Sequence, residues 1–118
     1  MKHTLLIITA LMLVVGVSNA QTHEAMEFYD DGKPKSIKTY KVSKDKIELV
    51  KESMWHENGQ KKSERTYTDG KYDGKVTGWH ENGQKWYERT FKDGKVISEE
   101  CWDEDGNECE CSVVGECK

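Results

Sequence analysis

The sequence is poor in several residue types, and these absences narrow the possible folds. Pro34 is the only proline in 118 residues, and no cysteine occurs before Cys101. After residue 20 the chain has neither the apolar spacing of an amphipathic helix nor an apolar run near the ~20 residues that a membrane helix needs. The net charge is −4, without the clustered lysine and arginine that neutralise phosphates. We therefore expect no helices and no nucleic-acid partner.

The one apolar run lies at the N-terminus. Lys2 precedes a run from Leu5 to Val17, and Ser18-Asn19-Ala20 offers small residues at the −3 and −1 positions of a cleavage site. This arrangement predicts a secretory signal peptide over residues 1–20 and a mature domain over residues 21–118. Because the run is too short for a bilayer, an uncleaved anchor is the less favoured alternative. We expect an exported protein, periplasmic or extracellular, with no transmembrane segment after cleavage.

The cysteines gather in an acidic C-terminal end, about residues 99–118. For an exported chain, disulfides are the first expectation. Cys109 and Cys111 would lie roughly 6–7 Å apart on one face of a strand, too far for an unstrained bridge, which leaves two pairings. A three-residue loop at 104–106 would set Cys101 opposite Cys109, so we favour Cys101 with Cys109 and Cys111 with Cys117. Zinc held by the four cysteines is the less favoured alternative; we expect no metal and no cofactor.

A repeat dominates the middle of the chain. The run from Trp55 to Lys61, Trp-His-Glu-Asn-Gly-Gln-Lys, returns 24 residues later from Trp79 to Lys85. An aromatic residue four positions before a glycine and another eight positions after it recur with each copy and also flank Gly32. A period of this length indicates an array of small supersecondary units.

Pairs of Asp or Asn with Gly divide the chain into segments of about eight residues. Such pairs favour hairpin turns of type I′, whose two central residues need positive φ. The pairs are Asp31-Gly32, Asn58-Gly59, Asp69-Gly70, Asn82-Gly83, Asp93-Gly94 and Asp105-Gly106. Between turns the side chains alternate, with Lys85, Tyr87, Arg89 and Phe91 expected on one side and Trp86, Glu88 and Thr90 on the other.

Three details depart from this regularity. Asp73-Gly74 follows Gly70 too closely for another strand, so we expect a bulge or a lengthened loop there. Ser43-Lys44-Asp45-Lys46 replaces the expected Asp-Gly turn and brings three extra residues, which predicts a looser loop. Pro34 suits an edge strand, where a missing amide donor harms no ladder.

The segment from Lys71 to Lys85 closely resembles the bacterial variant of the MORN repeat, and also the unit found in YwqK-type antitoxin proteins. The resemblance is good from about Trp55 to Gly94 and weaker from Phe28 to Tyr40. It implies an all-β fold, an antiparallel meander of β-hairpins in an elongated, twisted single-layer sheet. Val76 stands where family members often carry an aromatic residue, and the cysteine-rich end has no counterpart in the repeat.

Aromatic residues are the first candidates for binding. One expected row holds Phe28, Trp55, Trp79 and Trp102, and another holds Tyr40, Tyr67 and Phe91. Packing between consecutive hairpins is the expected role, although an exposed row would form a binding surface. Arg65 and Arg89 recur beside Glu64 and Glu88, as in a solvated charge ladder or an electrostatic recognition strip. The candidate binding residues are therefore Trp55, Trp79, Arg65, Arg89, Tyr67 and Tyr87.

No catalytic residues are predicted. His56-Glu57 and His80-Glu81 resemble the start of a zinc-protease motif, but Gln60 and Gln84 stand where the second histidine is required. We expect these histidines to fill, beside their turns, the position that Tyr29 fills in the first repeat.

The sequence thus predicts an exported, non-enzymatic repeat protein that binds another macromolecule, most simply a protein, through a sheet face or edge. Self-association is compatible with this prediction. One alternative is an antitoxin or immunity-type protein that neutralises a specific toxin. Another is a cell-envelope component that contacts glycan or lipid, for which the negative charge disfavours an anionic membrane.

Overall fold

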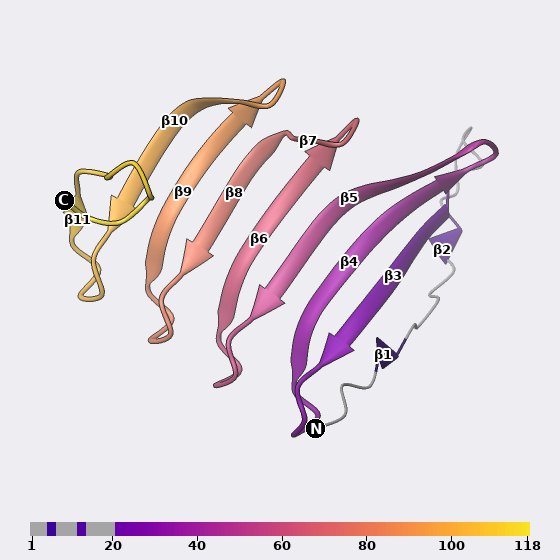
Figure 1. The fold of residues 1–118 in the computed structure, drawn as a ribbon, viewed down its shortest axis with the longest axis horizontal. Helices are drawn as coiled ribbons and strands as arrows, with labels where there is room; N and C mark the ends of the chain where they lie inside the picture. Colours follow the sequence, from indigo (N-terminus) through magenta and orange to yellow (C-terminus); the bar gives the residue numbers. More distant parts are fainter. Residues whose placement is uncertain (1–4, 7–11, 14–20) are drawn as a thin grey trace.

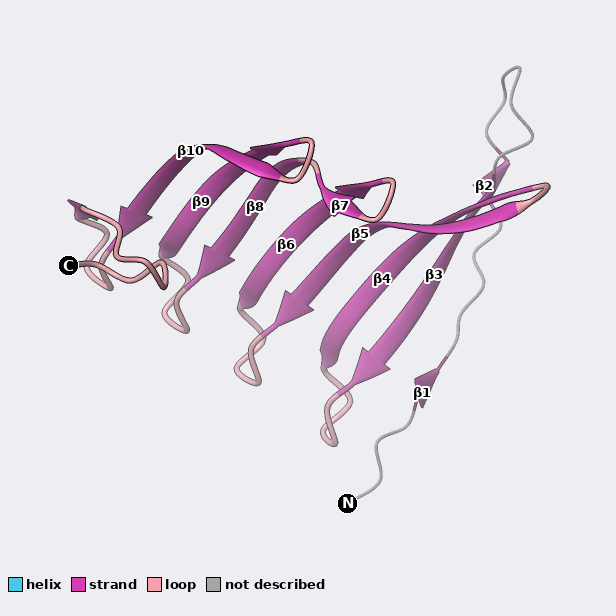
Figure 2. Cartoon of the chain, turned by 45° about the horizontal axis from the view of Figure 1, so that its top comes forward, coloured by secondary structure: helices cyan, strands magenta, loops and turns pink. Residues whose placement is uncertain are grey.

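The computed structural model describes residues 5–6, 12–13 and 21–118, and these form one antiparallel sheet without a helix (Figure 1). The sheet order is β1-β3-β4-β5-β6-β8-β9-β10-β11, with β2 also on β3 and β7 on β6. The strands are β1 (Leu5–Leu6), β2 (Met12–Leu13), β3 (Gln21–Phe28), β4 (Pro34–Ser43), β5 (Lys46–Trp55), β6 (Lys61–Thr68), β7 (Lys71–Tyr72), β8 (Gly74–Trp79), β9 (Lys85–Lys92), β10 (Lys95–Trp102) and β11 (Glu108–Cys109). The predicted all-β meander of hairpins in a single twisted layer is confirmed (Figure 2).

The predicted signal peptide, residues 1–20, lies outside the described residues except for β1 and β2. Both short strands pair with β3. Among the described residues, no helix has the length and apolarity needed to cross a membrane.

The Asx-Gly turns belong to two classes, one at each end of the strands (Figure 1). We call each row of turns a turn edge, as distinct from the outermost strands of the sheet. At one edge, Asp69-Gly70 and Asp93-Gly94 have positive φ at both residues, as type I′ requires. At the other edge only the glycine is positive, with φ between 85 and 89° at Gly32, Gly59, Gly83 and Gly106. The type I′ prediction is therefore wrong for the turns at Gly32, Gly59 and Gly83, whereas the three-residue loop predicted at 104–106 is confirmed.

The four turns at this second edge are three-residue loops, the geometry expected for 104–106. In the third repeat, His80 N donates to Gln84 O at 2.8 Å and Gly83 N donates to His80 O at 3.0 Å. Asn82 supports the loop from its side chain, because its Oδ1 accepts the amide of Gln84 at 2.9 Å. An Asx side chain that closes the wider loop explains why Asx-Gly occurs in both turn classes.

Two predictions about the first hairpins are wrong. Ser43 pairs directly with Lys46, so only two residues connect the strands, and the extra residues lengthen β4 and β5 to 10 residues each, with a register shift between Thr39 and Tyr40. Pairing more backbone is better than leaving it in a loop. Pro34 begins an interior strand, β4, where its missing N–H falls beside the register shift after Glu27.

The predicted bulge at Asp73-Gly74 is confirmed. β7 pairs Tyr72 with Tyr67, and β8 pairs Thr77 with Glu64, so residues 73–76 lie opposite residues 65–66. Gly74 has a φ of 81°, which favours glycine.

The two faces of the sheet differ in chemistry. On one face the register aligns Glu64 of β6 with Thr77 of β8 and Glu88 of β9. Trp55 follows Ser53, the partner of Glu64, by two residues, and Trp79 follows Thr77 by two residues, so both tryptophans lie on this side of the sheet. We name this side the tryptophan face. The residues that alternate with Glu64 and Glu88 form the opposite, arginine face; they are Ser63, Arg65, Tyr67, Tyr87, Arg89 and Phe91.

A single layer leaves little hydrophobic core. Val76 and Cys101 are the buried hydrophobic residues in the described part of the chain. Small polar residues are buried instead, each 4–8% exposed: Ser36, Ser53, Ser63 and Thr77. Longer side chains cover small residues, Gly78 among them. Tyr87 lies so close over Gly78 that a Cβ atom added to this glycine would be 2.3 Å from Tyr87 Cε1.

Lysine–glutamate clusters cover the tryptophan face. Glu64 pairs with Lys61 and with Lys51 at 3.0 Å, and 24 residues later Glu88 pairs with Lys85 at 2.8 Å and with Lys75 at 3.4 Å. The expected place of Lys85, on the same side of the strand as Tyr87, is wrong, because a register shift beside Trp79 turns Lys85 toward Glu88. The predicted alternation of residues 87–91 is confirmed. Hydrogen bonds from Lys61 and Lys85 lower the pKa of Glu64 and Glu88 respectively, and Lys51 and Lys75 add to the effect.

These clusters predict an acid-sensitive part of the stability. Because the folded-state pKa of both carboxyls lies below the ordinary 4.5, their contribution is complete above about pH 4.5 and is lost as pH falls through the folded-state pKa. Replacing Glu64→Gln and Glu88→Gln together should shrink the fall in unfolding free energy between about pH 6 and pH 3 by a few tenths to about 1 kcal/mol.

Urea unfolding across this pH range measures the effect. The matched control is Glu57→Gln with Glu81→Gln, which changes the charge equally at exposed positions without ion pairs among the described residues. An unchanged acid response in the Glu64/Glu88 variant would contradict the prediction.

Candidate binding site

A ladder of side chains joins the three-residue turns to one another. In each of the first three turns the residue after the leading aromatic reaches the backbone carbonyl of the next repeat's tryptophan. The bonds run from Tyr29 Oη to Trp55 O at 2.6 Å, from His56 Nε2 to Trp79 O at 2.9 Å and from His80 Nε2 to Trp102 O at 3.0 Å. The expected equivalence of Tyr29, His56 and His80 is confirmed. Burial raises the pKa of Tyr29, with Glu57 and Asp31 adding to it, so the phenol keeps the proton that it donates.

Other residues of the repeated motif also contact the next repeat. Asn58 Nδ2 donates to Glu81 O, and Asn82 Nδ2 donates to Glu104 O, each at 2.6 Å. The ammonium groups of Lys61 and Lys85 lie 5.6 and 5.5 Å from the ring centres of Trp79 and Trp102. The motif is thus a device for stacking hairpins, and Trp79 is already covered by a residue of its own chain.

The six predicted binding residues do not form one surface. Trp55 and Trp79 lie on the tryptophan face, whereas Arg65, Arg89, Tyr67 and Tyr87 lie on the arginine face. All six side chains are partly covered by their neighbours. A partner that lies on one face of the sheet would contact only one of these two sets, and whether any of the six residues binds a partner stays a prediction.

The two arginines have cross-strand partners that the sequence did not indicate. Arg65 Nη1 lies 3.4 Å from Glu52 Oε1, and Arg89 Nε lies 2.6 Å from Glu99 Oε2. The arginines of the expected charge ladder are paired, but with carboxylates of neighbouring strands, because Glu64 and Glu88 lie on the opposite face. Val76 takes the position equivalent to Glu52, so Arg89 turns to the next strand instead.

An aromatic stack crosses the arginine face through a residue that the predicted rows omit. The ring centres of Tyr67 and Tyr72 lie 5.1 Å apart, as do those of Tyr72 and Phe91. Tyr72 joins them because β7 bends with the bulge at Asp73. This stack fits the predicted packing role.

The C-terminal cysteines form two disulfides, but not with the favoured pairing. The bridges join Cys101 to Cys111 and Cys109 to Cys117, with Cα–Cα distances of 5.4 and 5.5 Å. The predicted register, in which Cys101 faces Cys109, is confirmed, and Cys111 in turn faces Cys117. The predicted pairing is wrong because β11 ends at Cys109 and the chain then folds back. The two disulfides therefore connect the facing pair Cys101 and Cys109 to the facing pair Cys111 and Cys117, and neither bridge joins two residues that face each other.

The tail folds back over the end of the arginine face and caps it. Cys101 Sγ contacts Gly115 O at 3.5 Å, and a Cβ on Gly115 would lie 2.6 Å from Arg89 Nη2. Ser112 N donates to Glu116 O and Gly115 N to Ser112 O, which is the hydrogen-bond pattern of the three-residue turns. Arg89 is therefore a residue that supports this cap.

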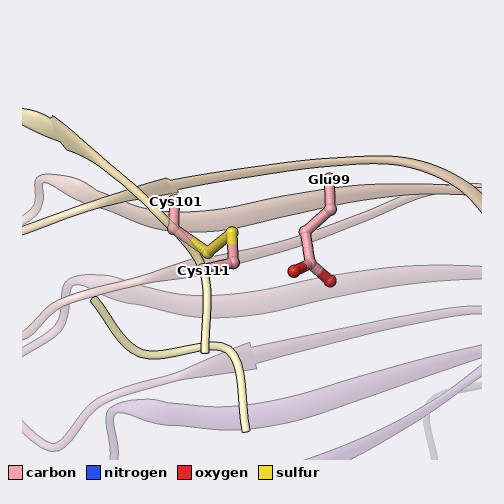
Figure 3. A group of neighbouring side chains, drawn as sticks. All are labelled: Glu99, Cys101 and Cys111. Carbon is pink, nitrogen blue, oxygen red and sulfur yellow. A yellow bond between two sulfur atoms is a disulfide. The ribbon is translucent and has the colours of Figure 1, made fainter. Parts of the chain in front are cut away.

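Glu99 lies beside the Cys101–Cys111 disulfide (Figure 3). The three residues are close enough to share an ion, but disulfide sulfurs are not the thiolates that zinc requires, and Glu99 already binds Arg89. The same bonding overturns the zinc alternative, because all four cysteines are oxidised.

Trp86 is an aromatic residue that the repeat does not explain, as is its neighbour Tyr87, which replaces Ser63 of the preceding copy. Lys62 holds the position equivalent to Trp86, 24 residues earlier. Trp86 has no register partner beside the shift at Trp79, and its indole stacks on the His80 ring at 5.4 Å and lies edge-on to Tyr87 at 5.5 Å. Subtracting one copy of the repeat from the other would have found it.

Two adjoining hollows of about 390 Å³ each open beside Trp86, and they share His80, Trp86 and Glu104. We name them together the Trp86 groove. Its other lining residues are His56, Trp79, Glu81, Asn82, Trp102, Asp103, Glu116 and Cys117. Because no serine or free thiol lines it and His80 is bonded to a carbonyl, the groove offers aromatic surface and carboxylates for binding.

Comparison with known protein families matches the model described as "MORN repeat variant" at residues 24–41, 50–69 and 72–93. No curated protein and no solved structure matches the chain. The third match ends before the cap, and it contains Trp86.

The ladder predicts a substitution pattern at His56. His56→Phe should lower the unfolding free energy by about 0.5–1.5 kcal/mol, because the Trp79 carbonyl loses its donor. His56→Tyr should retain most of it, since Tyr29 makes the same contact through its hydroxyl. Urea unfolding of both variants compares them directly, and equal stability of the two would contradict the ladder.

Proposed function

Since the chain belongs to the MORN repeat variant family, we propose that it uses its stacked hairpins as a rigid support for binding another protein, without catalysis. We propose that the partner contacts the Trp86 groove, which lies along the turn edge formed by the three-residue turns. Neighbouring strands lie about 4.8 Å apart, so equivalent turns recur at about 10 Å and extend the groove into a longer edge. A partner would lie along this edge.

The observation that carries the proposal is the place of Trp86. Trp79 and Trp102 are covered by lysines of the preceding repeats, and the histidines bond to backbone carbonyls. Each of these two tryptophans lines one of the hollows, whereas Trp86 lines both, together with carboxylates from three turns. A large aromatic side chain in a concave, partly polar setting is typical of the centre of a protein interface.

We also propose that the protein is exported. The two disulfides that close the C-terminal end fit an oxidising compartment, and residues 1–20 have the pattern of a signal peptide. The partner would then be a periplasmic or extracellular protein. Neutralising a toxin is a narrower form of this proposal, to which the resemblance to YwqK-type antitoxins points.

A reconstituted interaction tests the proposal. Partners captured from envelope and secreted extracts are purified and titrated against the protein by calorimetry. Trp86→Lys, which restores the residue of the preceding repeat, should weaken binding at least about tenfold, as expected for a central interface aromatic. The matched control Lys62→Ala, at the equivalent position, should bind normally. Equal affinity of Trp86→Lys and wild type would overturn the proposed site.

A further inference from the structure

We propose that the Trp86 groove receives a lysine or arginine side chain from an extended, basic segment of the partner. This inference rests on the proposed function, because it specifies what enters the same groove. Three independent features of the groove support it.

The first feature is charge. Glu81, Asp103, Glu104 and Glu116 line the groove, and no lysine or arginine does. Among the described residues, Glu81, Glu104 and Glu116 make no ion pair, in contrast to the glutamates of the two faces. Carboxylates gathered around a hollow without a cation complement a positively charged guest.

The second feature is that lysines of this chain already bind two of its other tryptophans in the proposed way. Lys61 lies over Trp79 and Lys85 lies over Trp102, each next to a glutamate that also binds the lysine. In the described part of the chain, no lysine or arginine lies over Trp86. An ammonium or guanidinium over this ring would complete the arrangement of cation, indole and carboxylate.

The third feature is the spacing of the edge. The first loop residue of all four three-residue turns is an exposed acid: Asp30, Glu57, Glu81 and Glu104. Successive turns are two strands apart, which corresponds to about 10 Å, or about three residues of a polyproline II segment, in which every third side chain points to the same side. A segment with a basic residue at every third position would therefore meet successive turns while one of its side chains occupies the groove.

Peptide titration tests this inference with a defined probe. The protein, in its processed form and with both disulfides oxidised, is labelled with ¹⁵N. It is titrated with acetyl-GKGGKGGKG-amide and with the same peptide in which glutamine replaces each lysine. We expect saturable shifts of the Trp86 indole N–H and of the amides of residues 80–82 with the lysine peptide, and affinity at least about fivefold weaker for the neutral peptide. Raising the salt from about 0.05 to 0.5 M should weaken the binding further.

Variants separate this inference from the proposed function. Trp86→Lys should abolish the shifts of the amides of residues 80–82. Glu81→Gln with Glu104→Gln, which leaves the ring in place, should weaken binding of the lysine peptide alone. Equal affinity for the lysine and glutamine peptides, or no shift at Trp86, would overturn the basic-segment inference. The proposed function would still stand if the purified partner required Trp86, and it would fall if the partner bound Trp86→Lys normally.

Discussion

A sheet with no second layer must stabilise each strand through its immediate neighbours, and the rest of this structure follows from that constraint. Without a facing sheet or helix, apolar side chains have little to pack against. Long side chains therefore lie flat over small ones: Tyr87 covers Gly78, and the lysine–glutamate clusters lie along the row that holds Ser53 and Thr77. The aliphatic stems of charged residues supply cover that a core would otherwise provide.

The same constraint explains the repeated motif. Strand pairing alone leaves the turns free to splay, and the motif joins each turn to the next through a histidine, an asparagine and a lysine. The array behaves as a one-dimensional stack in which each unit contacts only its neighbours. After the fourth of the three-residue turns, the disulfide-bonded tail takes the place of a further hairpin, covers Cys101 and packs against Arg89. Because the repeat is occupied with stacking, binding is left to departures from it, of which Trp86 is the clearest.

The sequence was sufficient for the architecture because a 24-residue period and regular Asx-Gly pairs define strand length and connection. It was insufficient for turn class, since Asx-Gly serves both type I′ turns and three-residue loops. The loop at Ser43 was misjudged because extra residues can be absorbed as paired strand. Single-residue alternation placed Arg89 correctly relative to its strand neighbours, but only the register showed that Glu99 is its partner.

The candidate site was harder to predict than the fold. Conspicuous tryptophans such as Trp79 are repeated because they serve stacking, so their repetition directed attention away from Trp86. The disulfide pairing depended on a fold-back after Cys109 that no local pattern encodes. Concave surface also arises between turns from different repeats, and a strand-by-strand analysis does not show it.

The central claim is that neighbouring hairpins, joined by the turn ladder, are the unit of stability. The most direct test removes one complete unit, residues 56–79, so that Trp55 is followed by His80 and the ladder is restored by equivalent residues. The account predicts a folded, cooperatively unfolding chain whose denaturant m-value is smaller in proportion to the missing surface, with both disulfides formed. A shortened chain that fails to fold, or that loses its disulfides, would contradict it.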